Sequence, residues 1–186
     1  MATKEVQQHG FQAEVKQLLD IVIHSLYTDS EIFVRELVSN ASDALEKARL
    51  KQLTENSVYQ ADAELKISIT TDEENNTLTI QDSGIGMNRD ELTENLGTIA
   101  HSGTKAFLEQ LKEKGDGNAD VIGQFGVGFY SAFMAADEVE VSTHSWDPEA
   151  ENLKWTSDGS TGYSIEEVDE QARGCKMVMK LKEGKE

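Results

Sequence analysis

The sequence predicts an α+β fold in which one mainly antiparallel sheet is covered on one face by helices. Two observations lead to this expectation. The chain begins with apolar residues at helical spacing, whereas much of the later part alternates apolar and polar residues as strands do. Strands that follow one another along a chain without intervening helices pair antiparallel, which places the helices on one side.

Two helices are expected near the start of the chain. Apolar residues recur every three or four positions over residues 11–27 and again over residues 31–53. Residues 28–30, Thr-Asp-Ser, supply turn and N-cap side chains between them. Shorter helices are expected over residues 89–96, 105–114 and 128–136.

A hairpin is expected after the two long helices. Alternating apolar residues predict two half-buried strands, one around Leu65, Ile67 and Ile69 and one over residues 77–81. The polar turn formers of residues 72–76 would join these strands. Four further strands are expected around Val139 and Val141, around Leu153 and Trp155, around Tyr163 and Ile165, and over residues 177–181.

The composition favours one globular domain and limits its partners. The chain has 186 residues and a net charge of −18, so nucleic acid and anionic membrane surfaces are not expected as partners. A magnesium nucleotide is compatible with this charge, because backbone N–H groups and a bound cation can offset the repulsion locally. Cys175 has no second cysteine to pair with, and no apolar run is long enough to span a bilayer, so we expect a cytoplasmic protein.

The second expected helix carries a polar face. Glu36, Asn40 and Asp43 fall at positions i, i+4 and i+7, so they lie on one side of it. Such a face is most often only a solvated surface. It would also suit catalysis, because the side-chain oxygen of Asn40 can coordinate magnesium, which needs few protein ligands beside phosphates. Glu36, one turn away, can orient and deprotonate a water that attacks the terminal phosphate.

Residues 82–87, Asp-Ser-Gly-Ile-Gly-Met, follow the second strand of the expected hairpin. Asp, Ser and Gly are common turn residues, so this segment can be a turn and nothing more. Alternatively, a buried Asp82 carboxylate at the end of a strand can accept a hydrogen bond from the amino group of adenine, which selects adenine over guanine. Gly84 and Gly86 would allow the backbone to approach the nucleotide closely, and Met87 would offer an apolar surface to the purine.

Two glycine-containing segments border the least regular part of the chain. Residues 123–129, Gly-Gln-Phe-Gly-Val-Gly-Phe, open an expected helix and can present N–H groups to phosphate. Their glycine spacing reverses that of the dinucleotide-binding fingerprint, which argues against a Rossmann fold. Residues 96–105 do not fit the spacing of a P-loop and are better interpreted as a lid with glycine hinges. Asn95, Ser102 and Thr104 could reach a nucleotide from this lid.

Together these segments resemble the N-terminal ATPase domain of the ninety-kilodalton heat-shock chaperone family, bacterial type. Residues 35–44 are similar to its catalytic helix, 82–87 to its adenine-binding motif, 96–105 to its ATP lid and 122–129 to the glycine motif that closes the lid. The resemblance covers nearly the whole chain. It implies the Bergerat fold of the GHKL superfamily, a two-layer α/β sandwich with a mainly antiparallel sheet and a mobile lid over about residues 96–128.

The resemblance also implies ATP or ADP with Mg²⁺ as the ligand. It assigns Glu36 as general base, Asn40 as the magnesium ligand and Asp82 as the adenine anchor. The nucleotide-contacting positions that it implies are Asn40, Asp43, Ala44, Asp82, Gly86, Met87, Asn95, Leu96, Ser102, Gly103, Gly123, Gln124, Phe125, Gly126, Val127, Gly128, Phe129 and Cys175.

At one position the chain departs from the family pattern. Where the family usually has Gly-Thr, this chain has Gly174-Cys175. The threonine hydroxyl of the family helps the aspartate to hold adenine, and a thiol is a weaker hydrogen-bond partner. Two interpretations stay open: Cys175 lies in the pocket wall and weakens base recognition, or it is simply a small buried residue.

The resemblance further implies that residues 1–186 form one N-terminal domain of a longer stress-response chaperone. The client-binding and main dimerisation regions would lie beyond this domain, so a homodimer and unfolded or partly folded client proteins are expected for the full-length protein. The family's middle domain supplies an arginine to the terminal phosphate. The ATPase activity of this domain alone is therefore expected to be slow.

Three other functions stay open from the residues themselves. The chain could be a nucleotide-sensing module without useful turnover, a histidine-kinase-type domain on the same fold, or an acidic interaction domain that binds no nucleotide. Loss of hydrolysis in Glu36→Ala would distinguish an ATPase from a sensing module. The kinase alternative is disfavoured, because the sequence has no helical His-Glu phosphoacceptor motif.

Overall fold

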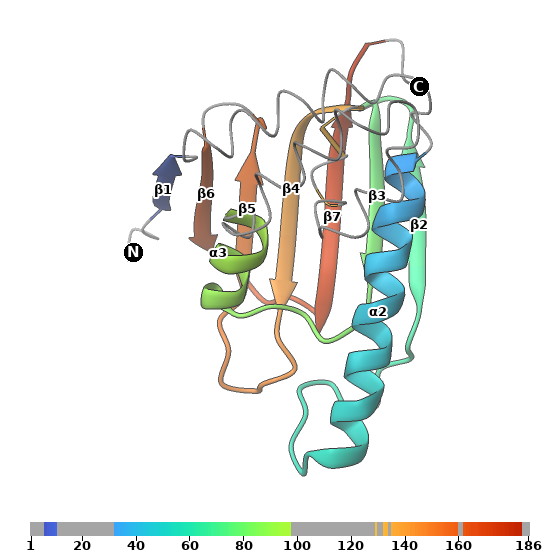
Figure 1. Ribbon diagram of the computed structural model, residues 1–186, viewed down its shortest axis with the longest axis vertical. Coiled ribbons are helices and arrows are strands. Elements are labelled where there is room, and N and C mark those ends of the chain that lie inside the picture. Colours follow the sequence, from blue (N-terminus) through green and yellow to red (C-terminus); the bar gives the residue numbers. More distant parts are fainter. Residues whose placement is uncertain are drawn as a thin grey trace, which may run out of the picture.

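The computed structural model describes residues 6–10, 32–97, 129, 132–133, 135–159 and 162–183. Within these residues, seven strands form one sheet in the order β1-β6-β5-β4-β7-β3-β2, and every neighbouring pair is antiparallel. Figure 1 shows the strands side by side, with both described helices in front of them. The elements are β1 (Val6–Gly10), α2 (Ile32–Thr54), β2 (Ile67–Asp72), β3 (Thr77–Asp82), α3 (Arg89–Gly97), β4 (Ala136–His144), β5 (Leu153–Ser157), β6 (Gly162–Glu167) and β7 (Gly174–Leu181).

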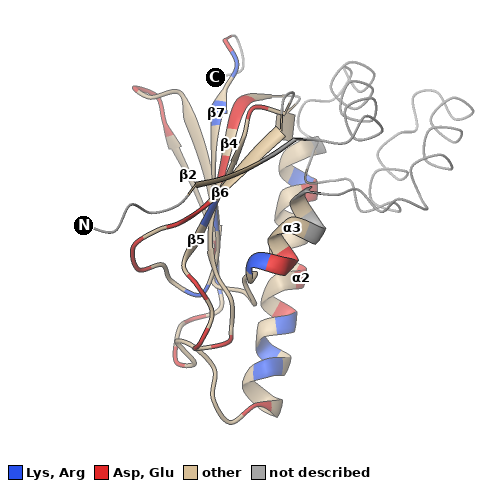
Figure 2. Ribbon diagram, turned by 90° about the vertical axis from the view of Figure 1, so that its left-hand side faces the viewer, with Lys and Arg blue, Asp and Glu red and all other residues tan. Residues whose placement is uncertain are grey.

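The described residues form two layers. In the side view of Figure 2, α2 and α3 lie on the same side of the sheet. The central strands alternate between a buried face and a more polar outer face, as in β4, where Val139 and Val141 are buried and Glu140 and Ser142 are partly exposed. The predicted α+β fold, a mainly antiparallel sheet covered on one face by helices, is therefore confirmed.

Helix α2 packs on β3 and β2 through a stripe of apolar side chains. Phe33, Leu37, Ala41 and Ala48 are buried, at spacings of four and seven residues that keep them on one face. Most of the remaining positions are polar and at least partly exposed. The helix expected over residues 31–53 is confirmed, with bounds one residue later at each end.

Helix α3 begins with a reciprocal capping box. The backbone N–H of Glu91 donates to the side-chain oxygen of Asn88 (2.9 Å), and the backbone N–H of Asn88 donates to the carboxylate of Glu91 (2.8 Å). Leu92 and Leu96 are then buried in the core. The short helix expected over residues 89–96 is confirmed.

The β2–β3 hairpin confirms the expected turn. The Asp72 carboxylate accepts hydrogen bonds from the backbone N–H (3.1 Å) and the side-chain amide (2.8 Å) of Asn75. The expected half-burial of the first strand is wrong at Ile69, which is 52% exposed. β2 is the last strand of the sheet, and α2 contacts it at few points, so the helix layer leaves Ile69 uncovered.

The four later strands are confirmed as β4, β5, β6 and β7. The helix expected over residues 128–136 is right only in part, because Phe129, Ala132 and Phe133 lie in helical turns but Ala136 already begins β4. The aromatic rings of this segment join the core: Phe129 contacts Trp155 edge-on, with the ring centroids 5.3 Å apart.

β1 was not predicted, because Val-Gln-Gln-His-Gly shows no apolar alternation; it becomes a strand by pairing with β6. The helices expected over residues 11–27 and 105–114, and the lid beyond residue 97, lie outside the described residues. Neither described helix is long and apolar enough to cross a membrane.

Strands β3 and β7 approach each other very closely at Gly174. Its φ is +112°, and a Cβ added there would overlap the carbonyl oxygen of Asp82. Both facts require glycine, because other residues rarely adopt this φ and carry the Cβ that does not fit. The end of β3, where Asp82 lies, therefore depends on a glycine at the start of β7.

We expect Gly174→Ala to lower the free energy of unfolding by at least about 2 kcal/mol, since it combines backbone strain with separation of β3 from β7. Urea denaturation measures this change. Lys176→Ala, at an exposed position of the same strand, is the matched control and should change the free energy by less than about 0.5 kcal/mol. Equal effects of the two substitutions would show that β7 tolerates a Cβ at position 174.

Candidate functional site

A cavity of about 530 Å³ lies between α2, α3 and the buried face of the sheet. Its size suits a small-molecule ligand, and its walls combine apolar side chains with a few polar ones, as ligand sites usually do. Among the residues that the sequence predicted to contact a ligand, those that line the cavity are Asn40, Asp43, Ala44, Asp82, Gly86, Met87, Leu96, Phe129 and Cys175.

The remaining predicted residues are Glu36, which does not line the cavity, and residues or side chains outside the described part of the chain. Glu36 is partly buried on α2, one turn before Asn40, and is not among the cavity-lining residues. Asn95 lies in α3, but its side chain falls outside the described residues. Also outside them are Ser102, Gly103, Gly123, Gln124, Phe125, Gly126, Val127 and Gly128, so the lid and the glycine motif stay predictions.

Three neighbouring strands place Asp82, Cys175 and Thr143 in one row, of which Asp82 and Cys175 line the cavity. Asp82 of β3 lies opposite Cys175 of β7, and Cys175 lies opposite Thr143 of β4. Opposed residues of antiparallel strands point their side chains to the same face of the sheet. A carboxyl group, a thiol and a hydroxyl group therefore lie side by side on the helix-covered face.

The Asp82 carboxyl group is buried and held by backbone donors. Asp82 is 9% exposed, and its Oδ1 accepts a hydrogen bond from the backbone N–H of Gly84 at 2.8 Å. Burial raises the pKa of Asp82 to about 6, and the N–H groups of Gly84 and Cys175 partly offset this by favouring the carboxylate. Asp82 is thus mainly ionised at pH 7, although it gives up its proton at a higher pH than an exposed aspartate does.

Thr143 connects the thiol to the surrounding backbone. Its hydroxyl donates to the carbonyl of Gly174 (2.8 Å) and accepts from the backbone N–H of Met87 (3.0 Å). Because the hydroxyl has only one proton, the 3.3 Å contact with Cys175 Sγ leaves the thiol as donor. Burial, with a smaller contribution from the Asp82 charge, raises the pKa of Cys175 to about 12, so the group lining the cavity is a neutral thiol.

Residues 83–87, here called the 83–87 loop, are fixed by hydrogen bonds to other parts of the chain. The backbone N–H of Ile85 donates to the carbonyl of Ala44 on α2 (3.0 Å), and the carbonyl of Ile85 accepts from the N–H of Trp146 (2.8 Å). Gly86 has a φ of +65°, and a Cβ there would overlap the carbonyl oxygen of His144. The loop is therefore pre-organised, with glycine required where it touches the end of β4.

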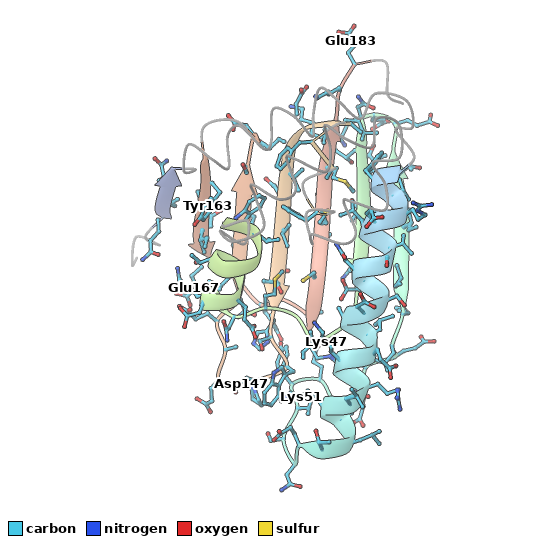
Figure 3. All side chains as sticks on the ribbon, in the orientation of Figure 1. Lys47, Lys51, Asp147, Tyr163, Glu167 and Glu183 are labelled. Carbon is cyan, nitrogen blue, oxygen red and sulfur yellow. The ribbon has the colours of Figure 1, made fainter. Side chains whose placement is uncertain are left out.

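Some cavity residues were missed by the sequence analysis. Lys47 lies one turn after Asp43 on the same face of α2, a spacing that could have identified it. Figure 3 shows Lys47 extending from α2 toward the ends of the central strands. Glu91 also lines the cavity, although its carboxylate is engaged in the α3 capping box. The apolar wall, which alternation alone could not assign to a site, consists of Leu37, Ala41, Ile80, Ile85, Val141 and Met177.

The site offers oxygen ligands for a cation without forming a closed metal centre. Among the described residues, no group of three or more His, Cys, Asp or Glu side chains could hold a metal ion. Asn40 is exposed, and its side chain lies at the cavity with Asp43 nearby on the same helix face. One or two such oxygen groups match the way proteins hold Mg²⁺ when phosphates and waters complete its coordination.

Comparison with known proteins agrees with this geometry. Residues 27–182 match the family described as histidine kinase-, DNA gyrase B-, and HSP90-like ATPase. The chain is 53% identical to the chaperone protein HtpG of Desulfitobacterium hafniense over 180 residues. This matched region is 96% of this chain and 29% of that protein. It is 54% identical over 177 residues to the HtpG of Rhodospirillum rubrum, with coverage of 94% and 28%. The chain thus spans less than a third of the length of these curated relatives.

The raised pKa of Asp82 predicts a stability difference that depends on pH. The ordinary value of 3.8 rises to about 6 in the folded state, so the folded state holds the proton more tightly and stability falls as the pH rises through this window. Asp82→Asn removes the charge, while its side-chain oxygen can still accept from Gly84. We expect this variant to be more stable than wild type by on the order of 2–3 kcal/mol above pH ~6 and by little at pH ~4.

Urea denaturation across this pH range tests the expectation. Asp90→Asn, at an exposed position of α3 that does not line the cavity, is the matched control and should show no such pH-dependent gain. If Asp82→Asn were no more stable than wild type at pH 7 to 8, the carboxylate would not carry the burial penalty described above.

Proposed function

The chain belongs to the family of histidine kinase-, DNA gyrase B- and HSP90-like ATPases, and from this premise we propose that its cavity binds ATP or ADP with Mg²⁺ and supports slow hydrolysis of the ATP. The observation that carries the proposal is the buried Asp82 carboxylate at the base of a cavity of about 530 Å³. A buried acceptor in a wall made mostly of apolar side chains selects for a ligand that can donate a hydrogen bond to it.

Adenine is the base that fits this acceptor. Its exocyclic amino group would donate to the Asp82 carboxylate, whereas the oxo group of guanine would place two acceptors face to face. Gly84 already occupies one carboxylate oxygen and so orients the group. Met87 and the apolar residues around it would contact the faces of the purine ring.

The phosphate end is assigned to the polar face of α2. Asn40 would hold Mg²⁺ through its side-chain oxygen, and Asp43 lies on the same side of the helix. When bound, the cation would neutralise part of the phosphate charge, in a protein whose net charge is −18. Lys47 brings a positive charge to the same wall.

Glu36 is proposed as the general base. It lies one helical turn before Asn40 and is partly buried. Its carboxylate would orient a water and take its proton while the water oxygen bonds to the terminal phosphorus. The bond from phosphorus to the bridging oxygen then breaks, giving ADP and phosphate.

The name of the relatives supports a chaperone role for the protein as a whole. In that role, closure of a lid over about residues 96–128 would convert the bound nucleotide into a change of conformation, because the closed state would bind ATP more tightly than the open one. We propose residues 1–186 as one N-terminal domain of a longer cytoplasmic stress-response protein. That protein would form a homodimer and act on unfolded or partly folded client proteins, with neither nucleic acid nor membrane as partner.

Calorimetric titration with Mg-ADP tests the assignment of Asp82. Wild type is expected to bind, and Asp82→Asn should lose roughly 1.5–3 kcal/mol, or about ten- to a hundredfold in affinity, because an amide is a poorer acceptor than a carboxylate. Wild-type affinity should also fall below pH ~6, where Asp82 becomes protonated. Asp90→Asn should bind as wild type does, and Mg-GDP should bind weakly to all three proteins.

Equal binding by wild type and Asp82→Asn would place the base elsewhere in the cavity. A folded wild type that binds no Mg-ADP would remove the nucleotide proposal and favour an interaction domain that binds other partners.

Single-turnover hydrolysis of labelled ATP tests the role of Glu36. Glu36→Ala should bind Mg-ATP with near wild-type affinity but hydrolyse it about 10²- to 10⁴-fold more slowly, the usual range for loss of a general base. Glu46→Ala on the exposed side of the same helix is the matched control and should retain the wild-type rate. Unchanged hydrolysis in Glu36→Ala would exclude it as base, and a wild type that binds but never hydrolyses ATP would be a nucleotide-sensing module.

A further inference from the structure

Arg173, the residue before β7, is buried in an unusual way. It is 1% exposed and is among the largest fully buried side chains of the described residues. Arginine is almost never fully buried unless it is paired with an acid, yet no ion pair of Arg173 is found in the described part of the chain. Burial accordingly lowers the pKa of Arg173. Such a costly placement requires another kind of partner.

The partners of Arg173 are backbone carbonyls from two separate loops. Nη2 and Nε donate to the carbonyl of Ser83 at 2.8 and 3.2 Å, and Nε also reaches the carbonyl of Gly84 at 3.2 Å. Nη1 donates to the carbonyls of Gln60 (2.8 Å) and Tyr59 (3.3 Å). The guanidinium group therefore links the loop after α2 to the 83–87 loop.

The bonds to Ser83 determine the direction of the donor that holds Asp82. The carbonyl of Ser83 and the N–H of Gly84 belong to one peptide unit, which is planar and trans, so they point in opposite directions. Fixing the carbonyl on Arg173 therefore aims the N–H away from it. That N–H is the group that donates to Asp82 Oδ1 at 2.8 Å.

We propose that Arg173 is a positioning residue for the ligand site: by holding the Ser83 carbonyl, it aims the Gly84 N–H at Asp82 and so fixes the orientation of the carboxylate. The part of this inference that concerns adenine rests on the function proposed above. Arg173 does not line the cavity and acts only through the peptide unit between Ser83 and Gly84.

Arg173 acts on the peptide unit between Ser83 and Gly84 through its N–H groups. Burial raises the pKa of Asp82, and the N–H groups of Gly84 and Cys175 lower it. What matters is the planar fork of the guanidinium, whose several N–H groups reach four carbonyls at once. A lysine at this position ends in a single nitrogen with three N–H groups, so it lacks the planar, spread-out fork that spans both loops.

The Asp82 titration measured by carbon-13 NMR of its carboxyl group tests the inference without any nucleotide. In Arg173→Met the Gly84 N–H is no longer held, the carboxylate loses stabilisation, and its titration midpoint should rise above about 6 by roughly half a unit to one unit. Arg173→Lys should give a smaller rise in the same direction. The other titratable groups at the cavity, Asp43 and Lys47 of α2, Glu91 of α3 and Cys175 of β7, are unchanged in these variants.

Arg89→Met is the matched control. Arg89 also links two elements, through paired hydrogen bonds to Glu151 at 3.0 Å each, but it does not line the cavity or contact the 83–87 loop. This variant should lower stability and leave the Asp82 midpoint as in wild type. A purely structural role of Arg173 would give the same pattern as Arg89, namely a lower melting temperature with an unchanged midpoint, and would overturn the inference.

Mg-ADP titration of the same variants between pH 5.5 and 8 connects the orientation to binding. The midpoint of the affinity profile should move upward with the NMR midpoint in Arg173→Met, with about a two- to fivefold loss of affinity near pH 6 and a smaller loss near pH 8. If Arg173→Met does not fold, Arg173→Lys decides the question by the same two midpoints. If the NMR midpoint shifts in Arg173→Met but the wild type binds no Mg-ADP, the positioning role is upheld and the nucleotide function is overturned. If the wild type binds Mg-ADP and the midpoints of the folded variants do not shift, the nucleotide function is upheld and the positioning role is overturned.

Discussion

The site depends on keeping one carboxylate charged at the base of a largely apolar cavity. Removing a charge from water is costly, and at Asp82 this cost raises the pKa to about 6. The ionised form is retained because N–H groups of Gly84 and Cys175 point at it. The backbone that carries each donor is itself fixed. Gly84 belongs to the 83–87 loop, and Cys175 belongs to β7, which pairs with β3. The fold thus supplies the polar surroundings that bulk water would otherwise provide.

The 83–87 loop makes close contacts with its neighbours, which keep the Gly84 N–H directed at the Asp82 carboxylate. Ala44 of α2 and Trp146 after β4 bind the main chain of Ile85, and Thr143 binds that of Met87. Such contacts need the loop to lie directly against its neighbours, and this is where glycine is required. Helix, loop and sheet are therefore fixed relative to one another by backbone hydrogen bonds as well as by the apolar core.

The charge distribution explains why an anionic ligand would need a cation here. Among the described residues, the cavity is lined by the acids Asp43, Asp82 and Glu91 and by one base, Lys47. The carboxylate of Glu91 is engaged at the start of α3, but the balance stays negative. Phosphates would therefore be repelled unless a divalent ion and N–H donors faced them, which is consistent with the oxygen ligands offered by Asn40 and its neighbours.

Local patterns predicted most of the fold. Helical spacing identified α2 and α3, alternation identified β2 through β7, and the polar turn at Asp72 was recognised from its side chains. The predictions were wrong or incomplete where contacts with distant segments of the chain determine burial or strand pairing. Ile69 is exposed because α2 contacts β2 at few points, and β1 exists because β6 is available for pairing. Neither fact is present in the few residues around each position.

For the candidate site, the sequence by itself determined which groups could do chemistry: the polar face of α2, the Asp82 motif with its glycines, and the odd Cys175. The types and spacings of these residues are local properties of the sequence, so they can be recognised without a structure. Only the tertiary structure decided that Asp82, Cys175 and Thr143 form one row, that Lys47 and Glu91 line the same cavity, and that Arg173 holds the loop beside Asp82. These relations join residues up to about ninety positions apart. They depend on strand register and on the direction of single peptide units, which no periodicity along the chain encodes.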